Sequence, residues 1–299
     1  MRTIELKISR GENLPVLPQV IGAVVKAADD PRTTARDLEK LIEQDAALTA
    51  KVLRVVNSPA YGVGQINSVG RALAVIGVNR VKGLLVSLAF QNMLADRSEA
   101  SNFNKIEYWR HSLAVANAAK ALGRLKVPYR AEELFCAGLL HDVGLIIMDK
   151  FCPDRLDSAV RVANAQGLSL CEAEAKVLPY NHAQLGGILA AKWGFGDGVR
   201  SMIERHHDKA CLTDNNDPGA FIMIADMVAH EAGFTNQLSA VVYRLNDEIL
   251  SSIDVSMGHV EALKEAITIE VEKAEQMFNL SGVPGIRRKP VVKGTSAAA

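Results

Sequence analysis

Residues 103–145 read FNKIEYWRHSLAVANAAKALGRLKVPYRAEELFCAGLLHDVGL and contain two segments with helical periodicity that carry ionisable side chains. In the first segment, Glu107 and His111 are four residues apart, so they project from the same face of a helix about one turn apart. In the second segment, an apolar run leads directly into His141 and Asp142. Burying an imidazole and a carboxylate at the end of a helix costs free energy unless a partner interacts with them. A divalent cation is a suitable partner for both groups. The alternative interpretation is a core histidine beside an aspartate that caps the next turn.

More candidate ligands follow this stretch, in segments that also have helical periodicity. They are His182 in NHAQLGGILAAKW, His206 and His207 in IERHHD, and Asp226 in MIADMVAH. Adjacent residues such as His206 and His207 project about 100° apart on a regular helix, so both can bind only at a helix end or to different ions. We interpret His230 and His259, on later predicted helices, as surface or packing residues.

The ligand types predict a divalent transition metal, with Fe, Mn or Zn as the candidates and one or two ions bound. The side chains expected to bind are His111, His141, Asp142 and Asp226 at one position, and Glu107, His182, His206 and His207 at a second. Mixed imidazole and carboxylate ligands favour these metals over Ca²⁺ and Mg²⁺. In two-metal hydrolases, ions ~3.5–4 Å apart clamp an attacking water and a phosphoryl oxygen.

The rest of the chain predicts an all-α fold made of two packed helical subdomains. About five segments before residue 98 have apolar residues at helical spacing, with Thr33 or Thr34, Asp45 and Ser68 as candidate caps. Further helices are expected at about 153–166, 169–178, 181–193, 197–207, 217–232, 237–250 and 256–279. The glycines of WGFGDGVR are expected to form a bend between two of these helices, because no strand precedes them and no Lys-Ser or Lys-Thr follows.

Three regions are expected from these patterns. Residues 1–97 form the N-terminal helical half, and residues 98–280 form the half with the metal site; the polar segment 95–102 marks the junction. Residues 281–299 contain four basic side chains among Gly, Pro, Ser and Ala, and we expect them to be a disordered basic tail.

Composition excludes several classes of protein. The chain has 299 residues, of which 48% are hydrophobic and 23% charged, as in a soluble globular protein. Lys plus Arg and Asp plus Glu are equal at 34 each, so no overall charge attracts nucleic acid or an anionic membrane. The four cysteines include no CxxC pair, and the N-terminus has no signal-peptide pattern. We therefore expect a cytoplasmic protein without membrane or nucleic-acid partners.

The order His111, then His141-Asp142, then a distant Asp226 resembles the HD superfamily of metal-dependent phosphohydrolases. The N-terminal half resembles the HDOD family of bacterial signalling proteins in three places. These are Leu14-Pro15-x-Leu17-Pro18, IEQDAALTAKVLRVVNSPAYG and SVGRALAVIGVNRV. The resemblance covers roughly residues 12–250. It implies an N-terminal helical bundle followed by an HD-type helical domain. It also implies a role in signal transduction, since the family has no settled enzymatic activity.

The ligand set is also similar to that of the HD-GYP phosphodiesterases, which hydrolyse cyclic di-GMP. Those enzymes read HDxGK and use the lysine to contact phosphate, whereas this chain has Leu145, and no GYP follows His207. These departures argue against hydrolysis of cyclic di-GMP, because the lysine supplies charge that stabilises the transition state.

Three hypotheses follow from the sequence. The first is a regulatory HDOD module that holds a metal or a nucleotide and docks a signalling partner protein. The second is an active metal-dependent phosphohydrolase on a nucleotide or cyclic dinucleotide. The third is a scaffold with a metal-free remnant of the site, against which the nearly full ligand set argues because buried charges without a metal are expensive.

Overall fold

Local sequence signals define the helices of the N-terminal half in the computed structural model, which describes residues 17–59, 61–94, 103–214, 217–238 and 244–277. The helices are α2 (Gln19–Ala28), α3 (Ala35–Glu43), α4 (Ala46–Val56), α5 (Val69–Ile76) and α6 (Val78–Leu94). Thr34, Asp45 and Ser68 each accept a hydrogen bond from a backbone N–H of the following helix, as predicted. Gly77 ends α5 with φ of 88°, a conformation that favours glycine.

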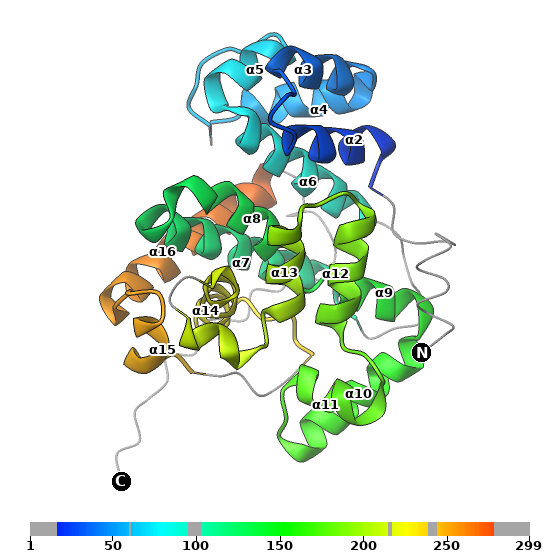
Figure 1. Ribbon diagram of the computed structural model, residues 1–299, viewed down its shortest axis with the longest axis vertical. Coiled ribbons are helices and arrows are strands. Elements are labelled where there is room, and N and C mark those ends of the chain that lie inside the picture. The colour runs from blue at the N-terminus through cyan, green and yellow to red at the C-terminus, as the bar shows by residue number, and fades with distance from the viewer. Residues whose placement is uncertain (1–16, 60, 95–102, 215–216, 239–243, 278–299) are drawn as a thin grey trace.

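Helices α2 to α5 gather at one end of the molecule, and α6 runs from them towards the remaining helices (Figure 1). Those helices are α7 (Lys105–Lys126), α8 (Ala131–Leu140), α9 (Val143–Phe151), α10 (Pro153–Gln166), α11 (Leu170–Val177), α12 (His182–Lys192), α13 (Asp197–Arg205), α14 (Pro218–Glu231), α15 (Asp247–Ser251) and α16 (Met257–Met277). Two short 3₁₀ helices, Pro128–Arg130 and Lys209–Thr213, complete the set. Since the described residues contain no strand, the predicted all-α fold is confirmed.

Helix α7 is the centre of the second half and packs against α8, α14 and α16. It is buried on nearly all sides, and its small residues Ala114, Ala116 and Ala118 allow neighbouring helices to approach closely. A Cβ atom added to Gly138 of α8 would lie 2.9 Å from the Cα of Ala116, so α7 and α8 cross too closely for any other residue at that position. This crossing brings the end of α8 close to His111 on α7.

The expected helix over 237–250 differs from what is observed. Among its described residues only α15 is helical, and residues 239–243 lie outside the described part of the chain. Gln237 has φ of 60°, and the side chain of Asn236 accepts a hydrogen bond from the N–H of Leu238, so a turn replaces the first helical residues. Asn246 then caps α15 by accepting from the N–H of Ile249.

Some sequence predictions concern residues outside the described part of the chain. These are the junction at 95–102 and the basic tail at 281–299. The boundaries of the predicted regions therefore stay predictions.

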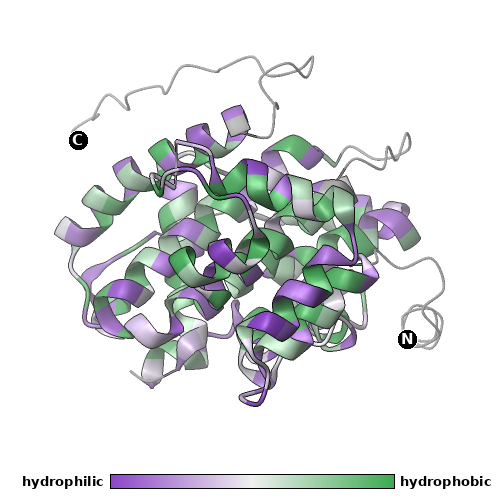
Figure 2. Cartoon of the chain, turned by 90° about the horizontal axis from the view of Figure 1, so that it is seen from above, coloured by the Kyte–Doolittle hydropathy of each residue, from purple (hydrophilic) through white to green (hydrophobic). Residues whose placement is uncertain are grey.

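Most of the helices carry both hydrophilic and hydrophobic residues (Figure 2), which fits helices that bury one face. In the described chain no single helix has the length and apolar character to cross a membrane. Helices α5 and α6 meet the criterion of length and composition only as a pair, and they bend by 117° where they join.

Candidate metal centre

Eight side chains from five parts of the fold meet in one place, which we call the histidine–aspartate cluster. They are His111 of α7, His141 and Asp142 between α8 and α9, His182 at the start of α12, His206 and His207 after α13, and Asp226 and His230 of α14. Local signals place several of them. Helix α8 ends immediately before His141, and a capping box of Asn181 and Gln184 makes His182 the first residue of α12. Since α13 ends at Arg205, the adjacent histidines lie at a helix end, where both can face the cluster.

Three imidazole rings are oriented by backbone carbonyl groups. The Nδ1 atom of His111 lies 3.0 Å from the carbonyl oxygen of Phe234, and that of His141 lies 2.8 Å from the carbonyl of Gly138. The Nδ1 atom of His206 is likewise 2.7 Å from the carbonyl of Ile203. A carbonyl can only accept, so each Nδ1 carries the proton and each neutral ring leaves its Nε2 unprotonated. Histidines that bind metals are held in this way.

His182 is oriented by a carboxylate. Its Nδ1 atom lies 2.7 Å from Oε2 of Glu174, which also accepts a hydrogen bond from the backbone N–H of His182. Glu174 is fully buried on α11. Sequence reasoning missed this residue, although a glutamate among the small apolar residues of CEAEAKV is an available signal for a buried polar contact.

Asp142 lies between two groups of imidazoles. Its Oδ2 is 3.4 Å from Nε2 of His141 and 3.7 Å from Nε2 of His111. Its Oδ1 is 3.2 Å from Nε2 of His182 and 3.6 Å from Nε2 of His206. One carboxylate therefore reaches both groups with different oxygen atoms, which suits a ligand shared by two cations.

Asn236 supports this carboxylate from a neighbouring loop. Its Nδ2 donates a hydrogen bond of 2.9 Å to Oδ2 of Asp142. Sequence reasoning did not single out Asn236, which lies in the connection between the helices expected at 217–232 and 237–250.

Asp226 and His230 close the other side of the cluster. Oδ1 of Asp226 is 3.2 Å from Nε2 of His111 and 3.4 Å from Nε2 of His230, one turn further along α14. The ring of His230 lies with its centroid 4.9 Å from that of His111. His230 is therefore a member of the cluster and not a surface residue. The i, i+4 spacing from Asp226 was a signal available in the sequence.

Two other residues lie outside the cluster. Glu107 forms an ion pair with Arg110, whose guanidinium also contacts Glu275 of α16 at 2.6 Å. His259 is exposed, and its ring contacts the hydroxyl of Ser256. Glu107 thus shares a helix with His111 but has a cationic partner of its own, whereas His259 agrees with the prediction of a surface residue.

The cluster contains more hydrogen-bond acceptor atoms than there are protons to pair with them. The Nε2 atoms of His111 and His141 are 3.3 Å apart, and those of His182 and His207 are 2.9 Å apart. Nε2 of His206 and Nδ1 of His230 are buried with no hydrogen-bond partner among the described residues. Paired ring nitrogens need a proton or a cation between them, so this donor set fits a divalent transition metal.

Three overlapping sets have ligand atoms within 4.8 Å of one another. They are Asp142 with His182, His206 and His207; His111 with His141 and Asp142; and His111 with Asp226 and His230. Asp142 and His111 each belong to two sets. The arrangement can therefore accommodate either one ion or two neighbouring ions that share a carboxylate.

Within the cluster, the pKa values of His182 and His207 are shifted in opposite directions. Burial lowers the pKa of His182, but the carboxylates of Glu174 and Asp142 raise it well above its usual value. Burial and the imidazoles of His206 and His182 hold the pKa of His207 well below its usual value. Without a metal, the raised pKa of His182 favours a proton on its Nε2, which lies 2.9 Å from Nε2 of His207 and 3.2 Å from Oδ1 of Asp142.

This proton makes metal binding sensitive to pH. A metal must displace it from His182, so Mn²⁺ affinity should rise by about tenfold per pH unit for each displaced proton while the pH is below the raised pKa of His182, and should level off above that pKa. The folding stability of the metal-free protein should instead fall as the pH rises. A raised folded-state pKa gives stability that is present below about pH 6.5 and is lost as pH rises through that pKa. Titration of metal-free protein with Mn²⁺ at several pH values tests this, and an affinity independent of pH would contradict it.

A cavity of about 540 Å³ lies beside the cluster. Besides six cluster residues, its wall includes the cationic side chains of Lys209 and Arg244, the carboxylate of Glu248 and the amides of Asn236 and Asn246. A cavity of this size and polarity can hold a small anionic molecule next to the imidazoles. Leu145 is not part of this wall, because it is fully buried in the core.

Comparisons with known proteins agree with this architecture. The family model for the HDOD domain matches residues 14–209. A protein of Treponema pallidum (strain Nichols), named "Uncharacterized protein", is 24% identical over 200 residues, which cover 67% of this chain and 38% of that relative. The matched part of the chain therefore spans less than half the length of that relative.

Two solved structures share the fold. The crystal structure of an HDOD domain protein with unknown function from Geobacter sulfurreducens has a TM-score of 0.73 and 22% identity, and covers 92% of this chain and 97% of its own. The structure of a protein named "Putative phosphohydrolase", from Shewanella amazonensis SB2B, has a TM-score of 0.68 and 20% identity over the same shares of the two chains. At these identities the likeness concerns the fold alone.

Proposed function

Because this chain belongs to the HDOD domain family, we propose that it is a signal-transduction module whose histidine–aspartate cluster binds one or two divalent transition-metal ions. The observation that carries this proposal is the orientation of four imidazoles. His111, His141, His182 and His206 each donate the Nδ1 proton to a carbonyl or carboxylate and direct Nε2 into the cluster. A purely structural group of histidines has no need for four rings held in the same manner.

We assign a separate ion to each of the two groups of imidazoles. His182, His206 and His207 hold one ion, and His111 and His141 hold the other, with Asp142 shared between them. Asp226 and His230 complete the second group. A bound divalent ion would polarise a phosphoryl oxygen and lower the pKa of water. Lys209 and Arg244, in the wall of the adjacent cavity, attract the negative charge of a phosphate-bearing ligand.

Measurement of metal content is the direct test of this function. We expect protein purified without chelator to contain Fe, Mn or Zn. A panel of phosphodiester and phosphomonoester substrates, tested on metal-loaded protein, then separates a regulatory module from an enzyme. A regulatory module binds metal and leaves the whole panel unchanged.

A metal-dependent phosphohydrolase is the second candidate function. It is favoured by the phosphate-compatible cavity beside the cluster, and the Shewanella protein of the same fold carries a name of this class. The substrate would be a nucleotide or a cyclic dinucleotide. Leu145 argues against cyclic di-GMP, because its side chain is buried in the core and offers no charge to a phosphate.

Turnover of cyclic di-GMP by the metal-loaded protein is accordingly expected to be slower than about 1 s⁻¹. The loss of one electrostatic contact of this kind typically costs ~10²–10³ in rate. Product formation followed by chromatography is the measurement. A turnover at or above about 1 s⁻¹, which is a normal enzymatic rate, would show that this protein needs no lysine at position 145.

For the partner, we infer a signalling protein in the cytoplasm that docks on helices α2 to α5. The support is their position at one end of the molecule, away from the cluster (Figure 1), and a hollow lined by Asn57, Ser58, Pro59 and the following glycines. The equal numbers of acidic and basic residues give no attraction to nucleic acid.

A further inference from the structure

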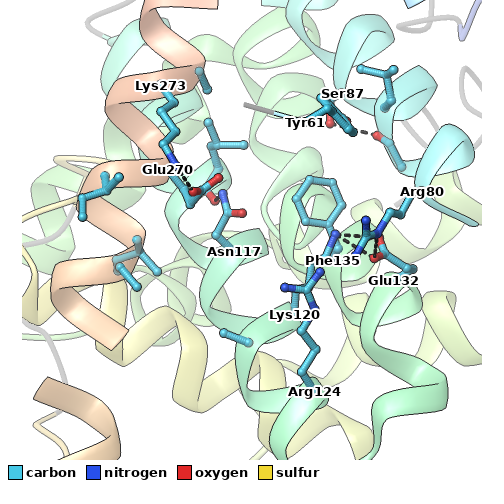
Figure 3. Close-up of a pocket in the computed structure, with 18 of the residues that line it drawn as sticks. Tyr61, Arg80, Ser87, Asn117, Lys120, Arg124, Glu132, Phe135, Glu270 and Lys273 are labelled. Atoms are coloured by element: carbon cyan, nitrogen blue, oxygen red, sulfur yellow. Dashed lines mark hydrogen bonds and ion pairs between the residues drawn. The ribbon is translucent and has the colours of Figure 1, made fainter. Parts of the chain in front are cut away.

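A second cavity, of about 640 Å³, lies where the N-terminal helices meet the rest of the fold (Figure 3). Its wall is built by α6, α7, α8 and α16, together with Val55 of α4 and Tyr61 from the segment after it. None of its lining residues belongs to the histidine–aspartate cluster or to the cavity beside that cluster. It is therefore a separate site, and its volume is within the range of small-molecule binding sites.

The wall carries more positive than negative charge. Its cationic side chains are Arg80, Lys120, Arg124 and Lys273, and its acidic side chains are Glu132 and Glu270. Figure 3 shows Arg80, Lys120, Arg124 and Glu132 together on one wall and the pair Glu270 and Lys273 on α16 across the cavity. An excess of two positive charges around a concave surface favours an anionic ligand.

Each acidic side chain already has a cationic partner. Glu132 accepts from Lys120 at 2.7 Å and lies 3.6 Å from Arg80, and Glu270 accepts from Lys273 at 2.8 Å. Arg124, one turn beyond Lys120 on α7, has no ion-pair partner among the described residues. Burial lowers the pKa of Lys120, and the charges of Arg124 and Arg80 add to this effect against the opposing charge of Glu132. An anion at this wall would relieve the repulsion between these cations.

The remaining surface is apolar and aromatic. The ring of Phe135 lies beneath Lys120, with Nζ 5.1 Å from the ring centroid, and Leu84, Leu113 and Ile267 also line the cavity. Gly83 of α6 faces Phe135 without a side chain; a Cβ atom there would lie 3.3 Å from the ring. Phe135 therefore packs closely on Gly83, and the apolar side chains give the wall a surface against which a planar group can lie next to the cationic side chains.

We propose that this cavity binds a nucleotide, with its phosphate at Arg124 and Lys120 and its ring system against the apolar wall. The carboxylate of Glu270, on the opposite side, is available to accept hydrogen bonds from a sugar hydroxyl or a base amino group. The basic segment at residues 287–293 of the chain is an unsuitable occupant, because it has the same sign of charge as the wall. The proposal is independent of metal binding.

Calorimetric titration of metal-free protein, in EDTA and low salt, tests the site. The probes are AMP, GMP, CMP and inorganic phosphate. We expect saturable binding of at least one nucleotide, about tenfold tighter than inorganic phosphate because the ring adds apolar contact. Absence of saturable nucleotide binding overturns the proposal, and so does equal affinity for inorganic phosphate.

Variants then locate the ligand. Arg124→Gln is expected to weaken nucleotide binding by about tenfold while leaving the melting temperature unchanged, because the Arg124 side chain is exposed. Arg161→Gln, at an exposed position on α10, is the matched control and should bind like the wild type. Lys120→Gln is a second variant on the same wall. Nucleotide binding that survives both Arg124→Gln and Lys120→Gln would place the ligand elsewhere and refute the proposal.

Discussion

Asp142→Ala is expected to remove most of the bound metal and with it the metal-dependent part of thermal stability. The carboxylate contacts both groups of imidazoles, so its loss affects every ion in the cluster. Loss of even a supporting group typically costs 10–100-fold in metal affinity, so we expect about 100-fold or more for a shared ligand. That change corresponds to about 2.7 kcal/mol less stabilisation by saturating metal. Elemental analysis and melting curves with and without Mn²⁺ are the measurements.

Asp154→Ala is the matched control. Asp154 is exposed in the first turn of α10, so its replacement should leave metal content unchanged and alter stability by no more than about 1 kcal/mol. The proposal of a metal centre fails if wild-type protein purified without chelator contains no metal and its melting temperature does not respond to Mn²⁺, Fe²⁺ or Zn²⁺. The cluster would then be a metal-free remnant, and the protein a scaffold.

Gly144→Ala is expected to lower the free energy of unfolding by about 3 kcal/mol or more. A Cβ atom at this position would overlap the carbonyl oxygen of His182, so α9 and α12 would have to move apart. Overpacking usually costs 1–3 kcal/mol, and a clash with backbone cannot be relieved by a side-chain rotation. Urea denaturation of the metal-free protein measures the loss.

Gly258→Ala provides the comparison for this variant. Its added Cβ would have an ordinary contact of 3.7 Å with the hydroxyl of Ser256, near the start of α16, so we expect no loss of stability. Equal stability of Gly144→Ala and wild type would mean that the two helices can separate without cost. In that case the position of His182 would not depend on the close contact of α9 with α12.

Much of the fold could be predicted because its signals are local. Thr34, Asp45 and Ser68 cap helices through backbone N–H groups three residues away, so their effect can be predicted from the neighbouring sequence. The turn at Gln237 was not predictable in this way. The segment has apolar residues at helical spacing, but Asn236 bonds instead to Asp142, 94 residues earlier in the chain.

The same distinction between local signals and long-range contacts applies to the candidate site. The His141-Asp142 pair was recognisable because it follows an apolar helix without a break. Glu174 could not be assigned, because its role depends on the contact of α11 with the start of α12. Glu107 has the same spacing from His111 as Asp226 has from His230, yet Arg110 and not the cluster is its partner. Spacing along a helix defines a face, but the packing of other helices decides what that face meets.

The packing of α7 against α16 also affects the order in which the protein can mature during synthesis. Helix α7 is complete at residue 126, but its neighbour α16 ends at residue 277. At ~5–20 residues per second, a ribosome needs roughly 8 to 30 s to make the intervening chain. Contacts between such distant segments form slowly even in a finished chain. During that interval the surface of α7 that α16 covers stays open to chaperones and to other nascent chains.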